Sequence, residues 1–167
     1  MNQPEILIVG AGGMGALFGS ILHENGLKVV LYDTNTEHIR AIQQAGLKIE
    51  GYGGDRTIPI AATSNLSELE SAEIIIFQCK SHGTRQASKA VKPLITQESV
   101  CISFQNGLGN EEEVMAEELG EDSVMGGLTA MAGVLLEPGK IRDFSRVPSH
   151  IGEMRGCLLY TSDAADE

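Results

Sequence analysis

The stretch Glu5-Ile-Leu-Ile-Val-Gly-Ala-Gly-Gly-Met-Gly15 decides how this chain folds. Its first half, Glu5 to Val9, is a short apolar run that is bounded by glycine, which is typical of a buried parallel strand. Its second half fits the pattern G-x-G-x-x-G, and apolar residues at helical spacing follow from Gly13 to Asn25. A strand, a glycine-rich turn and a helix in this order predict the start of a dinucleotide-binding α/β domain.

Each glycine of this turn has a physical role in that interpretation. The first permits a tight turn, the second lets the backbone approach a pyrophosphate, and the third lets the helix pack closely on the strand. The unpaired N–H groups at the helix N-terminus favour the negatively charged phosphates. The alternative is a glycine-rich turn with only a packing role. The predicted cofactor-binding residues of the turn are Gly10, Ala11, Gly12, Gly13, Met14 and Gly15.

Downstream of the turn, apolar strands alternate with helices. This alternation predicts right-handed βαβ winding and a Rossmann-type doubly wound, mostly parallel sheet. Pro59 confines the strand that contains it to an edge, and from residue 123 onward the chain is strand-like. We expect strands at 28–33, 47–50, 57–60, 74–77, 99–104 and 140–145, helices at 36–44, 84–91 and 111–119, and a short helical turn at 67–71.

Composition narrows the class of protein. The 167 residues carry 12 Lys and Arg against 23 Asp and Glu, which argues against a nucleic-acid partner. No apolar run is long enough to span a membrane, and the start lacks the basic residues of a signal peptide. The three cysteines form no Cys-x-x-Cys pair and the four histidines have no metal-ligand spacing, so we expect no metal site. These features are typical of a cytoplasmic α/β protein.

Polar residues follow three of the predicted strands. Asp33 comes eighteen residues after Gly15, where a carboxylate can accept hydrogen bonds from the adenosine ribose hydroxyls; an acid that starts a polar turn is the alternative. Lys80 follows the strand that ends at Phe77, and by position alone a lysine there is most simply solvated. Asn106-Gly107 follows the next strand, and any Asn-Gly can simply form a turn.

These residues together resemble the N-terminal domain of the ketopantoate reductase (2-dehydropantoate 2-reductase) family. The resemblance covers residues 5–154. It lies in the glycine turn and in four further stretches, which are Cys79-Lys80, Gln105-Asn-Gly-Leu-Gly109, Gly126-Gly-Leu-Thr-Ala-Met-Ala132 and Glu137-Pro-Gly139. Asn-Gly-x-Gly after a strand is its most specific part.

The resemblance implies roles for three further residues. Lys80 lies beside the cofactor, Asn106 touches both the nicotinamide side and the substrate, and Ala132 lines the nicotinamide pocket. The cofactor is NAD(P)H and the small-molecule partner is a 2-oxoacid. The family's usual NADPH conflicts with Asp33, which favours NADH. The general acid and the groups that handle the substrate carboxylate belong to a helical second domain, so no catalytic residue is assigned in this chain.

The last eleven residues, 157–167, break the pattern before them. They can be back-translated into a string that resembles a transposase-type sequencing adapter, and a natural polar tail is the alternative. We therefore expect a dinucleotide-binding domain over residues 1–156, which stops before the helical substrate domain, and a non-native tail after it.

The expected function is that of the dinucleotide-binding half of an NAD(P)H-dependent 2-oxoacid reductase, an oxidoreductase acting on a CH-OH or ketone group. The resemblance implies reduction of ketopantoate in pantothenate and coenzyme A synthesis, with the piece itself inactive. Two alternatives remain open: an NADH-dependent D-2-hydroxyacid dehydrogenase on the same scaffold, and a dinucleotide-sensing domain without chemistry. A homodimer of the longer parent protein also remains open.

Overall fold

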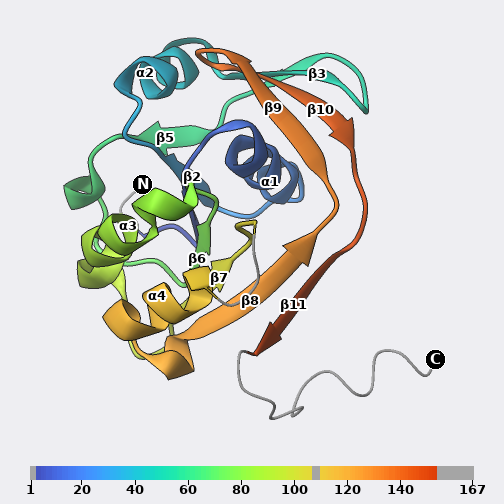
Figure 1. The fold of residues 1–167 in the computed structure, drawn as a ribbon. Coiled ribbons are helices and arrows are strands. Elements are labelled where there is room, and N and C mark those ends of the chain that lie inside the picture. The colour runs from blue at the N-terminus through green and yellow to red at the C-terminus, as the bar shows by residue number, and fades with distance from the viewer. Residues whose placement is uncertain (1–2, 107–109, 154–167) are drawn as a thin grey trace.

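The computed structural model describes residues 3–106 and 110–153, with the backbone alone at 110 and 111. Helices cover both faces of a seven-stranded sheet, and a four-stranded sheet packs beside it (Figure 1). The helices are α1 (Gly13–Glu24), α2 (Thr36–Ala45), α3 (Thr84–Val91) and α4 (Asn110–Leu119). The larger sheet contains, in spatial order, β11 (Ser149–Glu153), β8 (Val124–Thr129), β7 (Val100–Ser103), β6 (Ile74–Phe77), β1 (Ile6–Val9), β2 (Val29–Tyr32) and β5 (Ala61–Thr63).

The larger sheet is parallel except at β11, which runs antiparallel to β8. Strand β1 lies between β2, which is the next strand in the chain, and β6, which is separated from β2 by three further strands in the chain. The strand order therefore reverses next to β1, and ligands of open α/β sheets bind at such a switch point.

Alternate residues of β1 enter two separate apolar cores. Ile6 and Ile8 pack in the core that also holds Leu17 of α1 and Ile42 of α2. Leu7 and Val9 belong to the second core, on the side of α3 and α4. Because side chains alternate across a strand and both faces are covered, the strand is a continuous apolar run and not an alternating one.

The smaller sheet brings together residues that are distant in the chain. Its order is β4 (Arg56–Ile58), β3 (Leu47–Gly51), β10 (Lys140–Ser145) and β9 (Ala132–Glu137), with β3 parallel to β10. The hairpin β9–β10 runs alongside α1 in Figure 1. A Cβ on Gly13 would lie 2.5 Å from the Val134 backbone, so the first turn of α1 touches β9 directly.

The predicted fold class is confirmed, and most predicted elements lie within two residues of the observed ones. Strand β4 is an edge strand of the smaller sheet, as predicted, but it ends at Ile58 and Pro59 directly follows it. Two differences are instructive. Strand β5 (61–63) was not predicted, because three residues are too few to show a period. The helical turn expected at 67–71 is a single 3-10 turn at 66–68, where the Asn65 side chain accepts from the Ser67 N–H.

Candidate dinucleotide site

The predicted site residues lie at one edge of the larger sheet. Asn106, Lys80, the turn after Val9, and Asp33 follow the neighbouring strands β7, β6, β1 and β2 in that spatial order. The register aligns the strand ends, since Val9 pairs with both Phe77 and Tyr32. Four adjacent strands span three strand spacings, or roughly 14 Å. The edge can therefore hold an extended ligand with its two ends over β2 and β7.

The first glycine has the conformation that a tight turn requires. Gly10 has φ +98°, and a Cβ there would lie 2.5 Å from the backbone nitrogen of Cys79. The Gly10 and Ala11 N–H groups both donate to the carbonyl of Tyr32, at 2.9 and 3.2 Å. Any side chain at position 10 would therefore be strained and would press β6 away from the turn.

The other two glycines of the fingerprint differ in what surrounds them. A Cβ added to Gly12 would meet no atom within 4 Å, and its φ of −61° suits any residue. A Cβ added to Gly15 would overlap the carbonyl oxygen of Gly10. Packing within the described chain thus requires a glycine at position 15, whereas at position 12 it leaves open space that a ligand can fill.

The open space lies at a helix N-terminus. Helix α1 begins at Gly13, and no side chain caps it. Among the described residues nothing accepts a hydrogen bond from the Gly12 N–H. Unpaired N–H groups and the positive end of the helix dipole suit phosphate oxygens, so the turn fits the pyrophosphate of a dinucleotide.

Asp33 directly follows β2 and is held by its own turn. Its Oδ1 accepts from the Asn35 N–H at 2.8 Å, and the Asn35 side chain in turn accepts from the His38 N–H to cap α2. Burial, with a smaller contribution from the Asp33 charge, raises the pKa of the neighbouring Tyr32 phenol. The carboxylate is partly exposed at the sheet edge, where it can accept from ribose hydroxyls.

Lys80 and Asn106 are both exposed, and a buried glutamine joins the loops that carry them. The Gln105 Nε2 donates to the Cys79 carbonyl at 2.7 Å and to the Thr84 Oγ1 at 2.8 Å. Sequence reasoning did not assign this role to Gln105. Its position inside Gln105-Asn-Gly was the available signal, but nothing in the sequence pairs it with Thr84.

The structure places Ala132 at the start of β9, half-buried, and pairs it with Ser145. Residues 107–109, which complete the Asn-Gly-x-Gly motif, lie outside the described residues, as does the tail 157–167. The assignment of Ala132 to the nicotinamide pocket stays a prediction.

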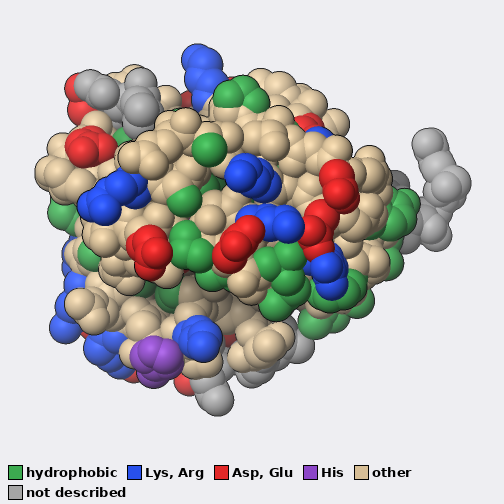
Figure 2. Space-filling view, turned by 90° about the horizontal axis from the view of Figure 1, so that it is seen from above, with side chains coloured by type: hydrophobic (Ala, Val, Ile, Leu, Met, Phe, Trp, Pro, Cys, Tyr) green, Lys and Arg blue, Asp and Glu red, His purple; other side chains and the backbone are tan. Residues whose placement is uncertain are grey.

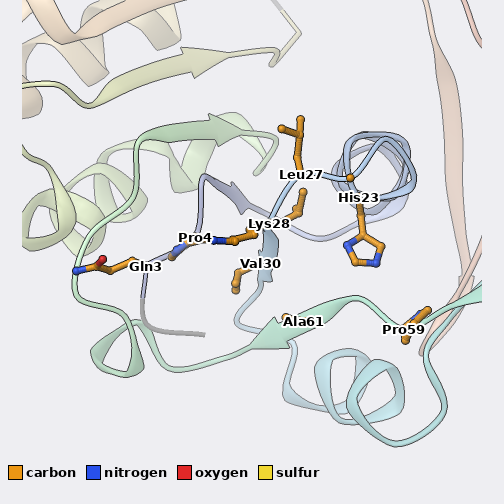
Figure 3. Close-up of a pocket in the computed structure, with 10 residues that line it drawn as sticks. Gln3, Pro4, His23, Leu27, Lys28, Val30, Pro59 and Ala61 are labelled. Atoms are coloured by element: carbon orange, nitrogen blue, oxygen red, sulfur yellow. The ribbon is translucent and has the colours of Figure 1, made fainter.

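A cavity of about 400 Å³ lies at the opposite, amino-terminal edge of the larger sheet. Figure 3 shows its lining residues coming from the start of β1, the end of α1 and the chain around β5, among them Pro4, His23 and Ala61. This cavity is separate from the glycine turn. The candidate dinucleotide site is instead an open edge of the sheet.

Other kinds of site find less support. Within residues 3–106 and 110–153, no group of three His, Cys, Asp or Glu side chains could hold a metal ion. Burial raises the pKa of the Cys101 thiol to about 12, which keeps it protonated and unreactive. On the face shown in Figure 2, basic and acidic side chains lie beside one another and form no large patch of one sign. No helix of the described part is long and apolar enough to cross a membrane.

The fold and the glycine turn define a Rossmann-type dinucleotide-binding domain. Residues 6–156 match the family model described as ketopantoate reductase PanE/ApbA. The chain belongs to this ketopantoate reductase family.

Three relatives illustrate the similarity. The 2-dehydropantoate 2-reductase of Pyrococcus abyssi is 35% identical over 138 residues, which are 83% of this chain and 44% of that protein. The crystal structure of 2-dehydropantoate 2-reductase from Geobacter metallireducens matches with a TM-score of 0.81 and 27% identity, over 89% of this chain and 48% of that one. A D-mandelate dehydrogenase with NADH and anilino(oxo)acetate matches with a TM-score of 0.76 and 25% identity, over 87% and 46%. The chain thus spans about half the length of these relatives.

Proposed function

We propose that this chain is the dinucleotide-binding half of an NAD(P)H-dependent 2-oxoacid reductase that converts ketopantoate to pantoate. The observation that carries the proposal is the alignment of Asn106, Lys80, the glycine turn and Asp33 along one sheet edge, in a chain of the ketopantoate reductase family. Because the chain spans about half of its relatives, the general acid and the groups that bind the substrate carboxylate would come from outside it.

The residues of this chain would bind and orient the cofactor. The turn Gly10–Gly15 would hold the pyrophosphate through backbone N–H groups, and Asp33 would accept hydrogen bonds from the adenosine ribose. Lys80 and Asn106 would lie on the nicotinamide side, with Asn106 also facing the substrate and Ala132 lining the pocket. When bound, the nicotinamide supplies a hydride from its C4 to the ketone carbon.

We further propose that the cofactor is NADH. A carboxylate placed for the ribose hydroxyls would repel the extra phosphate of NADPH. At ~4 Å and an effective dielectric near that of a protein surface, two unit charges repel by about 4 kcal/mol. Screening and rotation of the partly exposed Asp33 side chain reduce this to about 1–2 kcal/mol, or roughly a tenfold preference.

Isothermal titration of the chain with NADH and with NADPH tests both proposals. We expect both to bind weakly and NADH to bind about tenfold more tightly. Asp33→Ser should remove most of this preference, whereas the control Asp122→Ser, at an exposed position after α4, should leave it unchanged. Binding of neither dinucleotide would contradict the proposed function. Tighter binding of NADPH, with no gain from Asp33→Ser, would contradict the assignment of NADH alone.

The same Asp33 argument supports a second candidate, an NADH-dependent D-2-hydroxyacid dehydrogenase, since D-mandelate dehydrogenase shares this fold.

The 167-residue chain should oxidise no NAD(P)H with any 2-oxoacid. Sequencing the gene beyond codon 156 tests the proposed boundary between residues 1–156 and a non-native tail. An assay of the resulting longer protein with ketopantoate and with other branched 2-oxoacids then separates the two candidates.

A further inference from the structure

A buried histidine contacts the backbone of the glycine turn. His38 lies in the first turn of α2, and its side chain is almost completely buried. Its Nε2 lies 2.8 Å from the carbonyl oxygen of Ala11, and its Nδ1 accepts from the Gly139 N–H at 2.9 Å. The ring therefore joins the glycine turn to the turn between β9 and β10.

The two ring contacts define one tautomer. The Gly139 N–H can only donate, so Nδ1 must offer its lone pair and carry no proton. The Nε2 of the neutral ring then carries the proton, and this N–H donates a hydrogen bond to the Ala11 carbonyl. Gly139 has φ +78°, and a Cβ there would lie 2.8 Å from the Ala41 Cβ, so packing against α2 keeps this turn in place.

The bond to Ala11 sets the direction of the next N–H group. In a planar trans peptide unit the C=O and the N–H point in opposite directions. The carbonyl of Ala11 points to His38, so the N–H of Gly12, which shares its peptide plane, points away from His38. That N–H has no acceptor among the described residues, and the space beside Gly12 is open.

The same histidine connects two neighbouring parts of the candidate site. The Asp33 Oδ1 accepts from the Asn35 N–H, the Asn35 Oδ1 accepts from the His38 N–H, and the His38 ring donates to Ala11. One continuous series of hydrogen bonds thus runs from the proposed ribose carboxylate to the proposed pyrophosphate turn.

We infer that His38 is a positioning residue for dinucleotide binding: its Nε2–H holds the Ala11–Gly12 peptide so that the Gly12 N–H is aimed at the pyrophosphate. This inference rests on the proposed function. It assigns separate tasks to the two ring nitrogens. The Nε2 orients the turn for the ligand, and the Nδ1 secures the β9–β10 turn for the fold.

Two amide substitutions separate these tasks. The side-chain amide of His38→Gln can occupy the place of Nε2 and keep a donor to Ala11, but it has no acceptor for Gly139. The side-chain oxygen of His38→Asn can occupy the place of Nδ1 and accept from Gly139, but the side chain is too short to reach Ala11. The measurements are NADH affinity by isothermal titration and melting temperature, both on the 167-residue chain.

We expect His38→Gln to bind NADH within about twofold of the wild type despite its lower melting temperature. We expect His38→Asn to bind about tenfold more weakly, with the smaller loss of melting temperature. Equal affinity in both variants, or affinity that follows melting temperature, would overturn the inference. Failure of the wild type to bind NADH would overturn the proposed function together with it, which distinguishes the two failures.

A measurement on the wild type alone covers the case in which a variant does not fold. Long-range ¹H–¹⁵N spectra of the imidazole distinguish the two neutral tautomers. We expect the Nε2–H tautomer for His38, both free and with NADH bound. An Nδ1–H tautomer would show that the ring does not donate to Ala11, and this would overturn the inference.

Discussion

Gly12 and Gly15 belong to the same sequence pattern, but the structure gives different reasons for each glycine. A Cβ at Gly12 would meet nothing within 4 Å, whereas a Cβ at Gly15 would overlap the Gly10 carbonyl oxygen. We therefore predict that Gly12→Val leaves the fold intact and removes dinucleotide binding. Gly15→Ala, a smaller change, should damage the fold itself.

The stability change at Gly12 is the difference between two small effects. Replacing a glycine whose φ suits other residues stabilises the folded protein by about 0.4–1 kcal/mol, because it reduces the conformational entropy of the unfolded chain. Gly12 is also the N-cap of α1, where valine is among the least favourable residues and costs about 1 kcal/mol. The net change is within about 1 kcal/mol, which moves the melting temperature by roughly 2–4 °C. At Gly15 the added Cβ is fixed to the helix backbone and overlaps the backbone carbonyl of Gly10, so no flexible side chain can move to relieve the overlap. Gly15→Ala should therefore lower the free energy of unfolding by about 3 kcal/mol or more.

The effect of Gly12→Val on binding is much larger. The valine side chain would occupy the space beside the turn and keep the pyrophosphate away from its N–H groups. Hydrogen bonds to a charged group contribute about 1.5–3 kcal/mol each. Losing two of them costs at least about 3 kcal/mol, which is more than a hundredfold in affinity.

Isothermal titration with NADH and thermal unfolding of the wild type, Gly12→Val and Gly15→Ala check this prediction. The expected pattern is an unchanged fold without binding at position 12 and a lowered melting temperature at position 15. Wild-type NADH affinity in Gly12→Val would show that the ligand does not use the open space, and the proposed site would then be wrong. Strong destabilisation by Gly12→Val would refute the argument from packing.

Two further predictions concern stability. Gln105→Leu removes the donor that the Cys79 carbonyl and the Thr84 hydroxyl share, and it should lower the free energy of unfolding by about 1–3 kcal/mol in denaturant titrations, whereas Gln97→Leu at an exposed loop position should not. The ion pair between Arg56 and Glu24 joins β4 to the end of α1, and the hydrogen bond from Arg56 lowers the pKa of Glu24. This pair therefore stabilises the fold above pH about 4.5. Its contribution is lost as the pH falls through the lower pKa of the folded state. Glu24→Gln should therefore cost about 0.5–1 kcal/mol at pH 7 and progressively less as the pH falls below about 4.5, and a difference that does not shrink on acidification would contradict the ion pair.

The local structure was predictable because its signals are short-range. An apolar run followed by Gly10 indicated β1 and its turn. Glycines with positive φ, Gly26 and Gly46, lie just after α1 and α2, where glycine is favoured. The edge that carries Asp33, Lys80 and Asn106 followed from the same local information. The carboxyl ends of parallel strands all lie at one edge of the sheet, so residues that directly follow these strands are expected to lie together there. This expectation requires no information about contacts between distant segments.

Contacts between distant segments were decided only by the tertiary structure. The parallel pairing of β3 with β10, the Gly139 N–H on His38, and the Gln105 amide on Thr84 join residues that are 21 to 101 positions apart. A histidine in a helix, or a glutamine after a strand, has the same local pattern whether it is solvated or buried against such a partner. The sequence therefore determined the alternation of strands and helices, the glycine turn and the family. Tertiary packing determined which buried polar side chains hold that turn. A hydrogen bond needs two groups to come together, and the residues next to each group in the chain do not specify its partner.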